Sequence, residues 1–168
     1  MKLVGTFVAV VAGAGCLVGG DVPPDAEVNA SSLEQVPRYQ ALARINLQPY
    51  LSELGPTSIN CYVAGDVDDY KKIHPERTGA NVSLPWGTVI VREVLDANRR
   101  ITKLTVMAKG PPGYDPSLGD WWFAVTDPAG TPLVENGVPQ VGRMAQCHGC
   151  HIDRPQDDFL FGVPAAKM

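Results

Sequence analysis

The sequence predicts an α+β fold made mainly of antiparallel β-sheet, with a few short helices, one of them a motif-bearing helix near the C-terminus. Four runs of β-branched and aromatic residues are bounded by Gly, Pro, Asp or Asn, as strands usually are. The 17 Gly and 15 Pro residues favour a chain with many turns. With 168 residues, 45% of them hydrophobic, the chain has enough apolar side chains for one well-packed core.

The first 15 residues have the pattern of a signal peptide. Lys2 precedes an apolar run over residues 3–11, and small residues follow it. That run is shorter than the ~20 residues that a membrane-spanning helix needs. Two processing sites compete: an A-x-A site ending at Ala14, and a lipobox-like end in which Cys16 becomes lipidated, although Gly13 stands where that motif usually has Leu. Both predict an exported, periplasmic or otherwise extracytoplasmic protein, and the second predicts a lipoprotein anchored to the membrane.

A tether and then a single domain are expected after the signal peptide. Residues 16–30 are small, proline-containing and acidic, without an apolar period, which is typical of a flexible tether. Residues 31–168 then form the domain, and Ser31 is placed to cap its first helix. The apolar residues of that helix recur at helical spacing despite Pro37: Leu33, Tyr39, Leu42, Ala43 and Ile45.

The rest of the domain divides into strands, turns and two short helices. Strands are predicted for residues 57–64, 87–95, 101–108 and 121–126. Residues 96–100 form a hairpin loop between the second and third strands, and turns are expected at residues 111–113 and 127–130. Short helices are expected at residues 66–74 and 142–152.

Charge and cysteine content exclude two classes of protein. The formal net charge is -4, and no run of Lys and Arg exceeds two residues, so nucleic acid is not expected as a partner. The four cysteines are too few and too unevenly spaced for a disulfide scaffold. Of these, Cys61 lies within a predicted strand and is expected to be a buried free thiol.

The sequence Cys147-His148-Gly149-Cys150-His151 is a C-x-x-C-H motif, which is the attachment sequence of a c-type haem. Two thiols on one helical turn can add to the two vinyl groups at a haem edge, and the following imidazole becomes the proximal iron ligand. A zinc site would need a second C-x-x-C pair, and a thioredoxin-like motif would lie near an early β-α-β unit. The motif therefore predicts one covalent haem c, held by Cys147 and Cys150, with His151 as metal ligand.

The position of the motif indicates an open iron site. Small helical electron carriers have the motif near the N-terminus and a downstream methionine as sixth ligand, but here Met168 is the one downstream methionine, at the chain end. Met144 lies on the attachment helix itself, where it can hardly reach the opposite haem face. Met107, His74 and His148 remain as alternative sixth ligands, each also explained as an ordinary structural residue. Five-coordinate iron would bind small gases or react rather than only relay electrons.

Three further segments carry a resemblance to a known family. The motif is followed by six residues and then Asp158-Phe159-Leu160-Phe161. Upstream are the strand sequence GTVIVRE at residues 87–93 and the pair Trp121-x-Phe123. Over residues 57–162, this combination resembles the cytochrome P-460 and cytochrome c′-beta family of β-rich periplasmic haem proteins.

The resemblance also implies an activity. Hydroxylamine-oxidising members of the family join a lysine to the porphyrin from the position of Arg92, but a guanidinium is a poor nucleophile. This difference points to the cytochrome c′-beta members, which bind nitric oxide or carbon monoxide. Arg92 would then pair with a haem propionate or donate to a bound ligand, unless it is a solvated strand charge. The alternatives are a hydroxylamine-oxidising or peroxide-using haem enzyme and an electron-transfer cytochrome.

Further residues are expected to surround the haem. Phe159, Phe161, Trp121 and Phe123 are candidate walls, and Trp86 is a weaker one. Asp158 is expected to fix the loop after the motif or to orient His151. The expected partners are a small gaseous or nitrogen-oxide ligand and a redox partner protein, with a homodimer left open.

Overall fold

The computed structural model describes residues 28, 31–52 and 55–168. The expected signal peptide, Cys16 and most of the expected tether lie outside these residues. None of the helices in the described ranges has the length and apolar character needed to cross a membrane.

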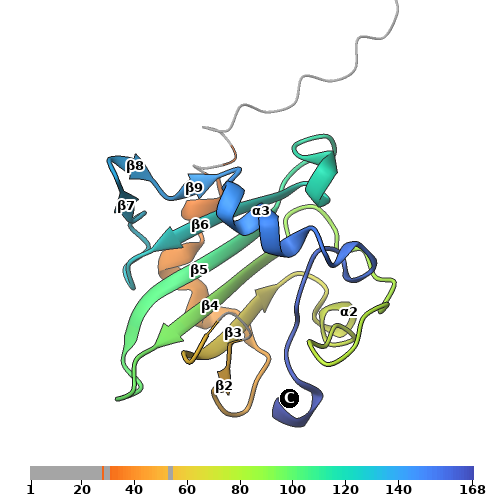
Figure 1. The fold of residues 1–168 in the computed structure, drawn as a ribbon, viewed down its shortest axis with the longest axis horizontal. Helices are drawn as coiled ribbons and strands as arrows, with labels where there is room; N and C mark the ends of the chain where they lie inside the picture. The colour runs from red at the N-terminus through yellow and green to blue at the C-terminus, as the bar shows by residue number, and fades with distance from the viewer. Residues whose placement is uncertain (1–27, 29–30, 53–54) are drawn as a thin grey trace, which may run out of the picture.

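An antiparallel sheet forms the centre of the fold (Figure 1). Its strand order is β1-β3-β4-β5-β6-β9, with β2 also paired to β3, and β7 and β8 form a separate pair. The sheet strands are β1 (Ala43–Arg44), β2 (Tyr50–Leu51), β3 (Ser58–Ala64), β4 (Val89–Leu95), β5 (Ile101–Lys109), β6 (Trp121–Thr126) and β9 (Val141–Gly142), and the separate pair is β7 (Val134–Glu135) and β8 (Val138–Pro139). The four long strands confirm the predicted α+β, mainly antiparallel fold class.

Both faces of the sheet are buried, so successive residues of one strand enter different cores. On β4, Ile90 and Val94 belong to the core on the side of the C-terminal helix, whereas Val91 belongs to the core on the side of the N-terminal segment. A strand buried on both faces reads as a nearly continuous apolar run, which explains the sequence VIVREVL. The sheet therefore separates two cores rather than covering one.

The helix predicted from Ser31 is wrong in its extent. Residues 31–33 are helical, but the chain continues as the 3₁₀ helix η1 (Val36–Ala41) and then enters β1. Pro37 has no N–H to donate and restricts the residue before it, so a continuous α-helix is disfavoured there. Ile45, expected on the same helix face as Tyr39, packs instead in the opposite core.

The start of the domain is also earlier than predicted. Val28, which falls within the expected tether, is only 5% exposed and packs in the core that contains Val36 and Trp122. An apolar side chain in a core contributes to stability, so the folded unit includes Val28.

The remaining helices are short. Both predicted short helices are present, as α2 (Val67–Tyr70) and α3 (Ala145–His151). Asp66 caps α2 by accepting a hydrogen bond from the N–H of Asp69. Three further 3₁₀ helices complete the chain: η2 (Pro116–Leu118), η3 (Pro155–Asp157) and η4 (Ala165–Lys167). Helix α3 lies over the sheet near β6 and β5 (Figure 1), and this position is what forms the candidate site.

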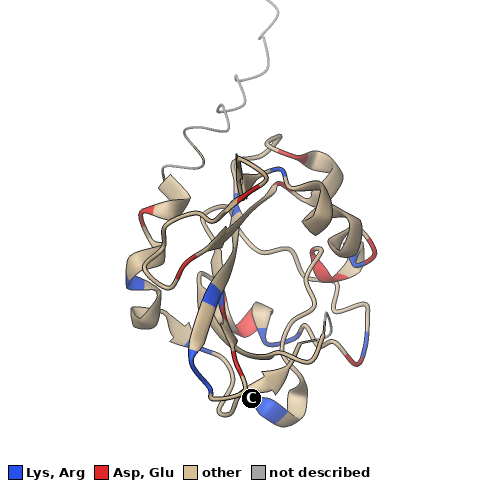
Figure 2. Cartoon of the chain, turned by 60° about the vertical axis from the view of Figure 1, so that its left-hand side comes forward, with Lys and Arg blue, Asp and Glu red and all other residues tan. Residues whose placement is uncertain are grey.

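Charged residues are spread over the fold. Figure 2 shows the positions of basic and acidic residues interspersed along strands and loops rather than gathered on one element. Four ion pairs join described residues, and those of Lys109 with Asp158 and of Arg154 with Asp157 are largely buried. Both buried pairs hold the segment that follows α3, next to the candidate site.

Candidate functional site

A cavity of about 220 Å³ lies between α3 and one face of the sheet. Its floor consists of two rows of residues paired across the strands. One row is Ile90, Met107 and Phe123, and the next is Arg92, Thr105 and Val125. The cover is one side of α3, with Gln146, Cys147, Cys150 and His151. The cavity is thus largely apolar, and its polar groups are concentrated at a few positions.

The three motif residues line the same cavity because of their helical spacing. Cys147, Cys150 and His151 are separated by three and four positions, which places them on one side of a helix. Cys147 and Cys150 are both free thiols and partly buried. Burial, followed by the neighbouring Cys150, raises the pKa of the Cys147 thiol to about 11, so this group is protonated at neutral pH.

The His151 imidazole is buried and oriented. Its Nδ1 donates a hydrogen bond of 2.5 Å to the carbonyl oxygen of Phe159, so the proton is on Nδ1 and Nε2 is the nitrogen with a free lone pair. The rings of Phe123 and Phe161 lie 5.3 and 5.1 Å from it, centroid to centroid. Burial, together with the positive charge of Arg92, lowers the pKa of His151 to about 4 against the opposing effect of the Phe159 bond. A neutral, oriented imidazole is the form that ligates a metal.

The loop after α3 owes its shape to contacts with distant parts of the chain. Asp158 and Phe159 both have positive φ, 52° and 61°, which is a costly conformation for residues other than Gly. The Asp158 carboxylate accepts a hydrogen bond from Lys109 Nζ at 2.5 Å and another from the N–H of Leu84 at 2.9 Å. Trp121 Nε1 donates to the Asp158 carbonyl at 2.8 Å. Asp158 therefore fixes the loop that carries the Phe159 carbonyl, and its carboxylate does not contact His151.

Two of the aromatic wall residues predicted from the sequence contact the imidazole, but only one of these lines the cavity. Phe123 both lines the cavity and packs on His151, whereas Phe161 packs on His151 from outside the cavity. Neither of the other two candidates lines the cavity: Trp121 is fully buried in the core, and the ring of Phe159 packs near Gly119 while its carbonyl accepts the His151 hydrogen bond. Trp121 and Phe123 are two residues apart on β6, so their side chains lie on the same face of the sheet. Trp121 is at the start of the strand, beyond the part of this face that lines the cavity.

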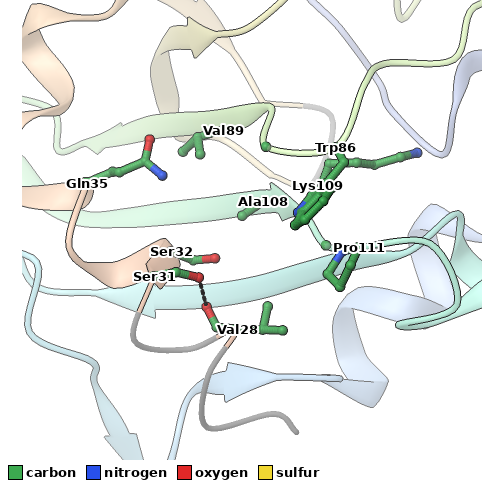
Figure 3. A pocket seen from close by; sticks show the side chains of 11 residues that line it. Val28, Ser31, Ser32, Gln35, Trp86, Val89, Ala108, Lys109 and Pro111 are labelled. Carbon is green, nitrogen blue, oxygen red and sulfur yellow. Dashed lines mark hydrogen bonds between the residues drawn. The ribbon is translucent and has the colours of Figure 1, made fainter. Parts of the chain in front are cut away.

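Trp86, the weaker wall candidate, does not line the cavity under α3. Its side chain is 69% exposed and borders a different hollow, of about 490 Å³, on the other side of the sheet. Figure 3 shows Trp86 beside Lys109, with Ser31, Ser32 and Val28 across the hollow. The residues that line this hollow include no His or Cys. Trp86 lies just before Gly87, whose φ of 86° turns the chain before β4 begins.

The candidate sixth ligands are separated by the fold. Met107 lines the cavity next to Phe123. His148 lines a neighbouring hollow with Met144, and His74 is buried elsewhere, where its Nδ1 donates to the carbonyl of Val163 at 3.0 Å. Met168 packs on the edge of the core. Met107 is thus the one of these five residues that faces the motif across the cavity.

The arrangement fits a covalently held haem. Two thiols and an imidazole with a free Nε2 face one cavity, and the buried Nε of Arg92, another residue of its lining, has no hydrogen-bond partner among the described residues. No three His, Cys, Asp or Glu side chains within the described ranges are grouped to hold a bare metal ion. Two thiols and an imidazole on one side of a helix are the groups that covalent haem attachment uses, and a haem held by them would bring its own iron.

Two residues of the site were missed by sequence reasoning, Thr105 and Lys109. Thr105 could have been found from register, because the hairpin at residues 96–100 implies that it pairs with Arg92 on β4. Lys109 has no such signal, because its partner Asp158 is 49 residues away.

No family model matches the sequence, and no curated protein matches it.

Proposed function

We propose that this chain is an exported mono-haem c-type cytochrome that binds nitric oxide or another small diatomic ligand. The observation that carries the proposal is the single cavity lined by Cys147, Cys150 and His151, with Nδ1 of the imidazole already bound to Phe159. The apolar run and small residues at the N-terminus support export, which haem attachment to C-x-x-C-H requires.

Each residue has a defined role in this proposal. Cys147 and Cys150 hold the haem through thioether bonds, and His151 presents Nε2 to the iron. The Phe159 carbonyl keeps the imidazole in one tautomer and one orientation. The bound haem supplies an iron atom at which a diatomic ligand can bind.

One row of the cavity floor, formed by Ile90, Met107 and Phe123, favours uncharged ligands over water. Ile90 and Phe123 are buried, apolar and side by side with Met107 on the same face of the sheet. Such a surface offers few hydrogen bonds to water, while a small uncharged molecule loses little on entering it. This environment supports gas binding more than chemistry that needs a general base.

The visible spectrum of the protein, matured with haem in a periplasm, tests the proposal. We expect high-spin ferric and ferrous forms, and a ferrous spectrum that shifts with carbon monoxide and with nitric oxide. The Cys147→Ser, Cys150→Ser double variant should lose covalent haem on a denaturing gel, whereas Cys61→Ser should keep it. Absence of covalent haem from the wild-type protein would refute the proposal.

An electron-transfer cytochrome is the second candidate, and Met107 is the observation that favours it. Its side chain lines the cavity opposite α3 and is 8% exposed. A methionine sixth ligand would give a low-spin spectrum indifferent to both gases, and Met107→Leu would then convert it to high spin. A strongly red-shifted ferrous Soret band would instead indicate a porphyrin cross-link and hydroxylamine oxidation.

A further inference from the structure

The guanidinium of Arg92 is a partly buried cation in the cavity lining without a carboxylate partner. Its Nη2 donates one long hydrogen bond, 3.4 Å, to the carbonyl of Gly162, and its Nε is buried with no partner among the described residues. We infer that Arg92 is the anion-binding group of the cavity and takes a carboxylate or a small oxyanion there. This inference rests on the proposed function in one respect, namely that a haem shares the cavity with the anion.

The acidic side chains closest in sequence and on the neighbouring loop have other partners. Glu93 follows Arg92 but points to the opposite sheet face, where its carboxylate accepts hydrogen bonds from Tyr39 and Asn60, both at 2.7 Å. Asp158 is paired with Lys109, and Asp157 accepts hydrogen bonds from the N–H groups of Gly79 and Ala80. None of the ion pairs among the described residues includes Arg92.

The polar groups behind Arg92 do not supply a negative charge. Cys61 lies opposite Arg92 on β3, and its Sγ is 3.2 Å from the hydroxyl oxygen of Tyr70. Burial raises the pKa of the Cys61 thiol, although the charge of Arg92 opposes the shift, and burial also raises the pKa of Tyr70. Both groups are therefore neutral at pH 7, while a guanidinium stays charged.

An anion in the cavity would neutralise the charge of the Arg92 guanidinium. An unpaired charge removed from water is costly, and Arg offers a planar fork that matches the two oxygens of a carboxylate or oxyanion. Thr105, the partner of Arg92 on β5, also lines the cavity and provides a hydroxyl beside it. The same cavity carries the motif residues, so the anion would lie next to the cofactor.

Two sources of such an anion share this chemistry. One is a propionate of the haem, which would be held permanently. The other is a free oxyanion of the size of nitrite, which would exchange with solvent. The two sources predict different effects of substituting Arg92. If Arg92 holds a propionate, the substitution changes the midpoint potential of the iron. If it binds a free oxyanion, the substitution weakens the affinity for that oxyanion.

The test compares the haem-loaded wild type with Arg92→Met, Arg92→Lys and the control Arg38→Gln, which removes an exposed arginine on η1. Nitrite affinity is measured by calorimetry, carbon monoxide affinity by absorbance, and the midpoint potential by redox titration from about pH 5 to about pH 9. Thermal unfolding checks that each variant folds. Should Arg92→Met not fold, Arg92→Lys, which keeps the charge but loses the fork, is used in its place.

A free oxyanion is indicated if Arg92→Met weakens nitrite binding by roughly tenfold or more while carbon monoxide affinity changes less than about twofold. A propionate is indicated if wild type does not bind nitrite but Arg92→Met shifts the potential and its pH dependence. Arg38→Gln should match wild type in both measurements. For Arg92→Lys the expected loss of nitrite affinity is about threefold or more.

Identical nitrite affinity and potential in wild type and in the Arg92 variant overturn the inference. If the purified chain carries no haem, the proposed function fails, but nitrite calorimetry on the haem-free wild type and Arg92→Met still decides the role of Arg92. Absence of Arg92-dependent nitrite binding in that haem-free protein also overturns the inference.

Discussion

The orientation of His151 depends on a backbone carbonyl in a costly conformation. Phe159 accepts the Nδ1 hydrogen bond with its φ at 61°, next to Asp158 at 52°. Positive φ at non-glycine residues costs on the order of 1 to 3 kcal/mol each, so other contacts must hold these two residues. Lys109, Leu84 and Trp121 supply those contacts through Asp158. The Lys109–Asp158 ion pair is thus connected to Nδ1 of His151 through one intermediate residue, Phe159.

Lys109→Met should therefore destabilise both the fold and the imidazole position. The side chains of Lys109 and Asp158 are only 10% and 6% exposed, so removal of the lysine leaves a buried carboxylate unpaired. The expected cost is about 3 to 5 kcal/mol in urea unfolding, with an altered iron–histidine band in the resonance Raman spectrum of the ferrous protein. Lys72→Met, which breaks an exposed pair with Asp69, is the control and should leave both unchanged. An unaltered iron–histidine band in Lys109→Met would show that the Lys109–Asp158 ion pair does not influence the position of the His151 imidazole.

Cys61 should make the protein less stable at high pH. Burial raises the pKa of this thiol above its usual value near 9, so the folded protein keeps a proton that the unfolded chain releases. Stability is then full below the unfolded value and falls as pH rises above it, by up to about 1.4 kcal/mol per pH unit. Urea unfolding between about pH 7 and about pH 10 should show a smaller decline for Cys61→Ala than for wild type. Equal declines would mean that Cys61 does not contribute.

At the scale of elements, the segment after α3 determines where that helix lies. Residues 152–163 run from α3 back into the core, where Leu160 and Val163 are completely buried. Gly162 has a φ of 69° and its Cα approaches the carbonyl oxygen of Ile73 so closely that no Cβ would fit. This contact joins the segment to the end of α2, which is far from it in sequence.

Gly162→Ala should disturb this contact. The new methyl group would meet the Ile73 backbone and would also strain a left-handed residue, so we expect a loss of more than about 2 kcal/mol in urea unfolding. Gly137→Ala is the matched control, because Gly137 also has a positive φ, 80°, but no atom lies within 4 Å of the position that its Cβ would take. That variant should lose only about 1 kcal/mol, from backbone strain. Equal losses would show that the close approach to Ile73 has no consequence.

In the molecule as a whole, the sheet separates two cores that pack against different parts of the chain. The core with Val28, Val36 and Trp122 joins the N-terminal segment to the sheet. The other core contains Phe123 and Met107 and borders the cavity under α3. Of these two cores, the second borders the cavity lined by Cys147, Cys150 and His151, so a group bound in that cavity would act on this side of the sheet.

If this cavity holds haem, as the proposed function requires, loss of the haem should destabilise the molecule. An empty cavity costs roughly 24 cal/mol per Å³ in protein cores, so about 220 Å³ corresponds to a few kcal/mol. Because an attached haem would fill this cavity in the folded state, the haem-free Cys147→Ser, Cys150→Ser variant should melt about 10 °C lower than the haem-loaded protein. Differential scanning calorimetry measures this, with Trp86→Ala, on the far side of the sheet, as a haem-loaded control expected to melt near wild type. Equal melting of the haem-free and haem-loaded forms would contradict a buried haem.

Most elements can be predicted because their signals are local. The strand from Trp121 to Thr126 has the predicted bounds, and α3 lies inside the predicted range, because runs of β-branched and aromatic residues and the turn residues that bound them act over a few positions. The first helix is wrong because Pro37 opposes its periodicity, and Val28 is missed because one apolar residue among polar ones gives no period. Local pattern is informative where neighbours in sequence decide the structure.

The local sequence is enough to place Cys147, Cys150 and His151 together on one side of a helix, since their spacing needs no distant contact. Which distant residues face these three side chains depends on the tertiary structure. It brought Arg92, Thr105 and Met107 to the cavity, and it took Trp121 and Trp86 away from it. The physical reason is that strand register, turn geometry and the Lys109–Asp158 pair join residues far apart in the chain, and no local pattern encodes their distances.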